Sequence, residues 1–180
     1  MSKPAKSSGR MHEVEQLAQL VQRLANNVPG YPPHELALAA RLSALLEKHM
    51  AEAASEALRP LELTYVLYQC LIIIQGGENG QIAPSELAEL TGERPNNVTH
   101  ICNYLAEHGY IKREHEAKDR RRVQLSLTPA GRRLLSKALP RIRKLWQYRF
   151  DGCSAPELTV LHDLLRRQIR NLEKAELEPE

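Results

Sequence analysis

Residues 119–131 read Asp119-Arg120-Arg121-Arg122-Val123-Gln124-Leu125-Ser126-Leu127-Thr128-Pro129-Ala130-Gly131. The first four side chains are charged, as is usual in an exposed turn. Val123, Leu125 and Leu127 then alternate with polar residues, which is typical of a strand with one buried face. Thr128 followed by Pro129 is typical of a helix N-cap with proline in the first helical position. A cationic turn, a strand and a capped helix in this order predict a winged helix.

The chain has 180 residues, which is enough for one domain with a real core or for a small domain with helical extensions. Aromatic residues make up only 4% of it, so the core has to be built from aliphatic side chains, and such a core favours helices. The longest apolar run, residues 70–74, is far below the roughly 18 residues of a membrane span. The first ten residues lack the apolar stretch of a signal peptide, and we therefore expect a cytoplasmic protein.

The net charge is only +3, but the charges are unevenly placed. Residues 11–110 hold five Lys and Arg against twelve Glu, whereas residues 111–149 hold thirteen Lys and Arg against three acidic residues. Because the basic excess begins at the predicted turn, it indicates an anionic partner such as DNA. Two alternatives stay open. One is a basic helix surface that is merely solvated, and the other is an anionic membrane, for which the segment lacks an exposed apolar face.

Apolar residues recur at helical spacing through most of the chain, separated by Pro and Gly. Gly109 is expected to take the left-handed position that ends a helix, and Pro140 is expected to kink one. Ser154 and Glu157 have the spacing of a capping box. The predicted helices span residues 11–26, 33–58, 61–75, 85–91, 95 to about 108, 129–150 and 154 onward, and the predicted strands span residues 81–83, 110–114 and 122–127. The expected fold class is mainly α with a small β-hairpin.

The amphipathic helices at both ends of the chain have more apolar surface than one small winged lobe can cover. A second subunit is the natural place to bury that surface, so we expect these helices to form a dimerisation domain around a winged helix-turn-helix. The expected divisions are a disordered tail (1–10), N-terminal dimerisation helices (11–60), a DNA-binding lobe (61–128), C-terminal dimerisation helices (129–175) and a frayed acidic end (176–180).

The predicted helices at 85–91 and 95–108 are joined by a short turn that contains Gly, as in a helix-turn-helix. The second helix carries polar side chains opposite its apolar stripe, and these can address base edges and phosphates in a major groove. The arginines of the hairpin can reach a minor groove, and Asp119 can hold their loop in shape. The predicted DNA-binding residues are Arg94, Asn96, Asn97, Thr99, His100, Asn103, Lys118, Arg120, Arg121 and Arg122.

The chain resembles the MarR family of bacterial transcription regulators over roughly residues 33–172. The most specific match is 119–121 followed by 127–131 at the spacing of the family, and residues 85–88 and 105–111 look like its reading helices. The resemblance implies a homodimer with intertwined terminal helices, two winged lobes on a palindromic operator, and repression as the common mode of action. It also implies a cytoplasmic bacterial protein that is associated with the nucleoid when bound to DNA.

The resemblance further implies a response to small phenolic or aromatic carboxylates that bind between the dimer helices and the DNA-reading lobe. Near that junction the sequence offers a cation, an imidazole and two phenols, which together can clamp a carboxylate and a ring hydroxyl. We expect a hydroxylated benzoate or a pyridine carboxylate as the effector. The alternative is that the tyrosines are core rings and the histidine is merely solvated. The candidate effector-binding residues are Arg41, His49, Tyr65 and Tyr68.

Other classes of function fit this sequence less well. The seven histidines lack the spacing of a metal or catalytic motif, and the sequence contains neither a phosphate-binding loop nor a nucleophile elbow. We therefore expect neither an enzyme nor a bound cofactor or metal. A winged helix that binds protein, a weakly specific architectural DNA binder and a cysteine-based redox sensor remain alternatives. Cys70 and Cys102 fall on apolar helix faces, and only Cys153 is expected to be exposed.

Overall fold

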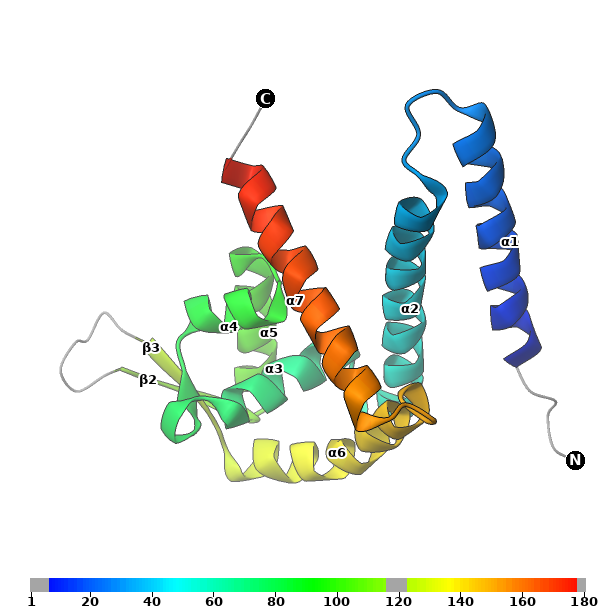
Figure 1. Cartoon of the computed structure of the whole chain (residues 1–180). Helices are drawn as coiled ribbons and strands as arrows, with labels where there is room; N and C mark the ends of the chain where they lie inside the picture. The colour runs from blue at the N-terminus through cyan, green and yellow to red at the C-terminus, as the bar shows by residue number, and fades with distance from the viewer. Residues whose placement is uncertain (1–6, 116–122, 178–180) are drawn as a thin grey trace, which may run out of the picture. The chain divides into compact units, whose positions relative to one another are not determined.

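The computed structural model describes residues 7–115 and 123–177, and within them the chain is mostly helical with a small antiparallel sheet (Figure 1). Its contacts divide it into two units, residues 1–138 and 139–180, and the boundary falls inside one long helix. In chain order the elements are α1 (Ser7–Asn27), α2 (His34–Leu58), the 3₁₀ turn η1 (Arg59–Leu61), α3 (Tyr65–Gly76), the 3₁₀ turn η2 (Glu78–Gly80), β1 (Gln81–Ile82), α4 (Pro84–Thr91), α5 (Pro95–Glu107), β2 (Ile111–His115), β3 (Val123–Leu127), α6 (Pro129–Arg149) and α7 (Ala155–Leu177).

The three strands form one antiparallel sheet in the order β1-β3-β2. In the central strand β3, Leu127 pairs with Ile111 of β2, and Ser126 pairs with Gln81 of β1. The sequence predicts the hairpin and a short strand near residue 81, but it does not indicate that this strand joins the far edge of β3. The mainly α winged-helix fold is confirmed, and the short strand joins the predicted hairpin in a three-stranded sheet.

Aliphatic side chains fill the core of the first unit, as the low aromatic content predicts. Helices α3 and α4 contact β3, and α5 contacts β2, so the three helices cover one face of the sheet. Burying one Leu or Ile side chain stabilises a fold by about 1.5–3 kcal/mol relative to leaving it exposed. The largest fully buried members are Leu58, Leu71, Ile74, Ile82, Leu87, Leu105 and Leu125.

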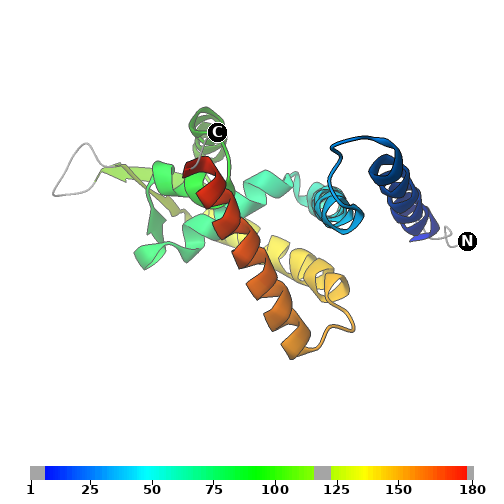
Figure 2. The same cartoon turned by 45° about the horizontal axis from the view of Figure 1, so that its top comes forward.

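Helices α1 and α2 lie side by side and run in opposite directions (Figure 1, Figure 2). Val21 is the most deeply buried residue of α1, with 1% of its surface exposed. A carboxylate oxygen of Glu13 on α1 lies 2.9 Å from His49 Nε2 on α2. The helix begins at Ser7, inside the segment predicted to be a disordered tail, because polar residues with a solvated face can extend a helix ahead of its apolar stripe.

Helix α3 begins at Tyr65, four residues later than the apolar spacing predicts. The chain first passes through η1 and through Glu62, which has a left-handed φ of 53°. Thr64 then caps α3 by accepting a hydrogen bond from the Leu67 amide at 3.2 Å. Apolar spacing alone could not show this change of direction. No single helix among the described residues has the length and hydrophobicity of a membrane span, although α2 with η1 and α3 meet those criteria together as a pair bent by 82°.

Thr128 ties the end of β3 to the turn between α5 and β2. Its hydroxyl lies 2.6 Å from the Gly109 carbonyl oxygen, to which it donates, and its amide donates to the Tyr110 carbonyl at 3.0 Å. The hydroxyl also accepts a hydrogen bond from the Gly131 amide at 3.1 Å, which confirms the predicted N-cap of α6. Gly109 has a φ of 70°, the left-handed conformation that the sequence predicts.

Gly131 is required at this junction because the α6 backbone passes directly over Tyr110. A Cβ atom built on Gly131 would lie 2.0 Å from the Tyr110 carbonyl oxygen and 3.0 Å from its carbonyl carbon. Both contacts are with backbone, which cannot swing aside as the end of a flexible side chain can. The helix can therefore approach the turn this closely only with glycine at this position.

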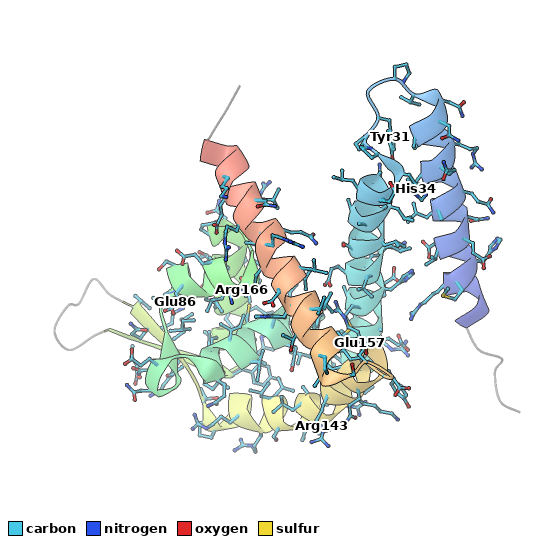
Figure 3. The ribbon with its side chains drawn as sticks, in the orientation of Figure 1. Tyr31, His34, Glu86, Arg143, Glu157 and Arg166 are labelled. Atoms are coloured by element: carbon cyan, nitrogen blue, oxygen red, sulfur yellow. The ribbon has the colours of Figure 1, made fainter. Side chains whose placement is uncertain are left out.

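The second unit contains the end of α6 and the whole of α7. Pro140 lies inside α6, which continues through it as one helix, and the predicted kink stays a prediction. The capping box is confirmed: the Ser154 amide donates to a Glu157 carboxylate oxygen at 2.8 Å, and the Glu157 amide donates to Ser154 Oγ at 3.5 Å (Figure 3). Hydrogen bonds from the Ser154 side chain and backbone lower the pKa of Glu157.

Helix α7 presents apolar side chains that the chain itself leaves exposed. Five of them recur every three or four residues, so they form a stripe along one side of the helix. The members of the stripe are Leu158, Leu161, Leu165, Ile169 and Leu172, whereas the exposed Val160 and Leu164 lie outside it. Isolated exposed leucines are ordinary on protein surfaces, but a continuous stripe of five indicates an interface.

Gly131→Ala should destabilise the protein by roughly 1–3 kcal/mol, because the new methyl group has to displace backbone at Tyr110. Urea unfolding followed by circular dichroism measures the loss. Gly76→Ala is the matched control, since its Cβ meets nothing within 4 Å at the end of α3. The control should change the free energy of unfolding by at most about 1 kcal/mol, in the stabilising direction. Equal stability of the two variants would contradict the argument.

Candidate nucleic-acid interface

Helices α4 and α5 form the predicted helix-turn-helix. The hydroxyl of Thr91 at the end of α4 donates to the Leu87 carbonyl at 2.7 Å, and Gly92 then turns the chain with a φ of 69°. Pro95 lies in the first turn of α5, as the sequence predicts. Leu87 and Leu105 are fully buried on the facing sides of the two helices. This packing leaves the opposite side of α5 in contact with solvent.

The predicted reading residues of α5 lie on that solvent-facing side. Asn96, Asn97, Thr99 and His100 are exposed, and Asn103 is half-buried further along the helix. Arg94 occupies the N-cap position and is also exposed. On the neighbouring helix α4, the carboxylate-bearing Glu86 lies in the first turn (Figure 3). The placement agrees with the sequence-based expectation, and the roles of these residues in binding stay predictions.

Two of these side chains are bonded within the helix-turn-helix itself. Asn97 Nδ2 donates to a Glu93 carboxylate oxygen at 2.6 Å, and the Thr99 hydroxyl donates to the Pro95 carbonyl at 3.0 Å. The amide nitrogen of Asn97 carries a second N–H, so it can donate to a base while its bond to Glu93 persists. The Thr99 methyl group is not involved in its bond and keeps its capacity to meet a thymine methyl.

Arg113 on β2 is a functional candidate that the sequence analysis did not identify. Its Nη2 donates to Asn103 Oδ1 at 2.7 Å. This arginine thus joins the wing strand to α5. The signal in the sequence was weak, because Arg113 stood among many cations and only the register of β2 shows which way it points.

The base of the hairpin carries a second group of charges on the other face of the sheet. Lys112 Nζ lies 2.6 Å from a Glu114 carboxylate oxygen, and Gln81 Nε2 donates to the same carboxylate at 3.4 Å. Glu114 therefore offsets the charge of Lys112. The predicted hairpin residues Lys118, Asp119, Arg120, Arg121 and Arg122 lie outside the described residues.

The four candidate effector residues have different surroundings. Tyr65 and Tyr68 stack with ring centroids 6.2 Å apart. The pKa of Tyr68 is raised, mainly because its side chain is buried and to a smaller extent by the electrostatic effect of Tyr65. His49 is bonded to carboxylates, with Nε2 2.9 Å from Glu13 and Nδ1 3.4 Å from Glu52. Arg41 is exposed on α2, eight residues or about 12 Å along the helix axis from His49. An effector carboxylate at His49 would therefore have to compete with two protein carboxylates.

A cavity of about 650 Å³ lies where α2, η1 and the start of α3 meet. Its charged lining residues are Glu52, Glu56, Glu62 and Arg59, and Arg59 is itself paired with Glu56 at 2.8 Å. The net charge of the lining is negative. The cavity is of a size that holds a small ring, but its charge disfavours a carboxylate.

The cysteines are placed as the sequence predicts. Cys70 and Cys102 are buried and Cys153 is exposed. Burial raises the pKa of the Cys70 thiol to about 12, and burial also raises the pKa of Cys102 although Arg113 opposes the rise. Neutral, buried thiols are poor nucleophiles, so neither residue has the character of a redox sensor.

Residues 63–123, which include the whole helix-turn-helix, match the model of the MarR family. The transcriptional regulator YdcH of Bacillus subtilis, itself uncharacterized, is 30% identical to the chain over 119 residues, which cover 63% of this chain and 80% of YdcH. The chain belongs to the MarR family. Its helix-turn-helix and its strands β2 and β3 are therefore the reading lobe of a MarR-type winged helix.

Other MarR-type proteins match over more of the chain. The transcriptional repressor MprA of Escherichia coli K12 is 27% identical over 160 residues, which cover 89% of this chain and 90% of MprA. A crystal structure of a MarR mutant from E. coli complexed with operator DNA superposes with a TM-score of 0.65 at 21% identity, covering 80% of this chain and 96% of that one. This MarR-family chain is thus a transcriptional regulator, and its relatives include a repressor.

Proposed function

We propose that this MarR-family regulator is a repressor that binds a palindromic operator as a homodimer and leaves it when a small aromatic carboxylate binds. The observation that carries the proposal is the exposed polar side of α5, which adjoins strands leading into a segment with four cations. In this proposal α5 lies in a major groove and the hairpin follows the neighbouring minor groove.

The proposed contacts divide into two chemical kinds. The hairpin residues Lys118 and Arg120 to Arg122, together with Arg94, neutralise phosphates or enter the minor groove, and they contribute affinity for any duplex. The polar side chains of α5 address base edges and contribute sequence preference. Asn96 and His100 are exposed, and Asn97 is exposed with one of its two amide N–H groups bonded to Glu93.

Binding to duplex DNA should weaken steeply with salt, with a log–log slope of about 0.9 for each neutralised phosphate. Arg120→Ala and Arg121→Ala should weaken binding to every duplex and lower the slope by about 0.9 each. His100→Ala and Asn97→Ala should instead reduce the preference for the operator over random DNA by about 1–3 kcal/mol per lost base contact. Fluorescence anisotropy over a salt series measures both quantities.

Lys137→Ala is the control, because it removes an exposed cation of α6 outside the helix-turn-helix and the hairpin. Its affinity should stay close to that of the wild type. Absence of a salt-dependent slope in the wild-type protein would reject DNA binding altogether. If the hairpin and α5 variants changed affinity for operator and random DNA alike, the division into the two kinds of contact would be wrong.

Dimer formation is proposed because it would cover the exposed stripe of α7. Leaving the five large apolar side chains of the stripe in water is unfavourable by about 25 cal/mol for each Å² of apolar surface, so their burial against a second copy would stabilise the assembly. A two-fold arrangement would also place two reading lobes on one operator, as a palindrome requires.

Leu165→Glu should convert the dimer to a monomer, because it places a charge in the middle of the stripe, where Leu165 is 45% exposed in the single chain. Size-exclusion chromatography with light scattering should give a mass near twice 20.4 kDa for the wild type and near 20.4 kDa for the variant. Arg167→Ala, about 200° further around α7, is the control and should remain dimeric. A wild-type mass of one chain would exclude the proposed dimer.

The proposed effector is a small aromatic carboxylate that draws on the phenols of Tyr65 and Tyr68. Arg41 lies 17 residues, or about 25 Å along the helix axis, before the end of α2, so within one chain it does not reach the same ligand. This placement avoids the glutamate-lined cavity beside η1, where a negative ligand would be repelled. His49, which bonds two carboxylates, has a smaller part in this proposal than the sequence suggests.

Hydroxybenzoate and nicotinate should raise the melting temperature of the protein and release it from DNA, whereas benzylamine should do neither. At a ligand concentration about 100 times the Kd the stabilisation amounts to about 2.7 kcal/mol. Tyr65→Phe should weaken the response, and Arg23→Met, which removes an exposed cation of α1, should keep it. If benzylamine raised the melting temperature and the two carboxylates did not, the ligand site would be the acidic cavity and the carboxylate effector would be rejected.

A further inference from the structure

The wing strand β2 is attached to the reading helix α5 at one polar point. In the sheet register, Arg113 pairs with Leu125 and Lys112 pairs with Ser126. Directly opposed residues of an antiparallel pair project from the same face, and Leu125 is fully buried under the helices. Arg113 therefore projects toward α5, whereas Lys112 projects from the opposite face, where it pairs with Glu114.

The guanidinium of Arg113 bonds one side chain of α5. Its Nη2 donates to Asn103 Oδ1 at 2.7 Å. Asn103 directly follows Cys102, which is only 2% exposed, so the bond connects the strand to a part of the helix that is held in the core. The planar guanidinium of arginine directs its N–H groups in a fixed geometry, which the ammonium group of lysine does not.

The bond between Arg113 and Asn103 lies close to the point where β2 leads into the hairpin tip. Ile111, two residues earlier, is buried and anchors the start of β2. The Arg113 side chain, by contrast, is exposed. Two residues after Arg113 the strand ends, and residues 116–122 with their four cations follow. Leu125, which lies opposite Arg113, is the last buried residue of β3 on the way to the hairpin tip, so the Arg113–Asn103 bond joins α5 to the wing at the rung where the core ends.

We propose that Arg113 is a positioning residue that fixes the direction of the wing relative to the reading helix, so that both can engage adjacent grooves of one duplex. This inference rests on the proposed DNA-binding function. It also gives Asn103 a task besides the one the sequence suggests, because its side-chain oxygen accepts from Arg113.

The test compares Arg113→Met, Arg113→Lys and Asn103→Leu with the matched control Lys112→Met, which removes a neighbouring cation from the other face of the same strand. The wild-type protein first selects its preferred duplex from a random pool. For each variant, affinity for that duplex is measured over a salt series. Dimethyl sulfate then probes both grooves at once, since it methylates guanine N7 in the major groove and adenine N3 in the minor groove.

Lys112→Met should lower the salt slope by at most about 0.9, the value for one phosphate. Arg113→Met should lower it by roughly 1.8 or more, because several cations of the wing lose their phosphates, and it should reduce affinity by about tenfold. Adenine N3 protection should disappear while guanine N7 protection under α5 remains. Arg113→Lys should resemble Arg113→Met although its net charge is unchanged, and Asn103→Leu should show the same loss in weaker form.

Three results would overturn the inference. The first is a slope for Arg113→Met equal to that of Lys112→Met, which would make Arg113 an ordinary cation. The second is full recovery by Arg113→Lys, and the third is joint loss of protection in both grooves by a variant that remains folded in urea titration. If Arg113→Met fails to fold, Arg113→Lys and Asn103→Leu carry the test. A wild-type protein without a salt slope or any protection would instead show that the proposed function itself is wrong.

Discussion

The close approach of α6 to the turn after α5 is the constraint on which the lobe depends. Thr128 bonds the Gly109 and Tyr110 carbonyls, and Gly131 lets the α6 backbone pass over Tyr110 where no Cβ fits. The reading helix, the wing and the long helix α6 thus meet within a few residues. Because the contacts of Gly131 and of the Thr128 amide with Tyr110 are between backbone groups, side-chain rotation cannot relax the close approach of α6 to this turn. The Thr-Pro-Ala-Gly sequence at 128–131 is explained by this contact.

The polar side of α5 is more ordered than a simple row of solvated side chains. Asn97 is bonded to Glu93, Thr99 to its own helix, and Asn103 to Arg113. Such bonds hold side chains in one rotamer before any partner arrives, which lowers the entropy lost on binding. The bonded residues therefore differ in kind from Asn96 and His100, which the helix presents to solvent.

The uneven charge along the sequence corresponds to distinct places in the structure. The acidic first part includes the glutamates around the cavity beside η1 and the pair that binds His49. The basic part begins with β2, where one cation is offset by Glu114 and the next, Arg113, bonds α5. Charge counting could show that the two parts differ. It could not show that His49 was already engaged by carboxylates, because Glu13 lies 36 residues away along the chain.

The sequence by itself determined the order of the helices, the N-cap at Thr128, the capping box at Ser154 and the burial of Cys70 and Cys102, because each depends on local spacing or on hydrophobic periodicity. Tertiary structure alone decided the pairing of β1 with β3, the bond from Arg113 to Asn103, and the clash that excludes a side chain at Gly131. These features join residues that are distant in sequence. Their geometry follows from strand register and from how closely two backbones approach, and neither quantity is encoded in the periodicity of a single segment.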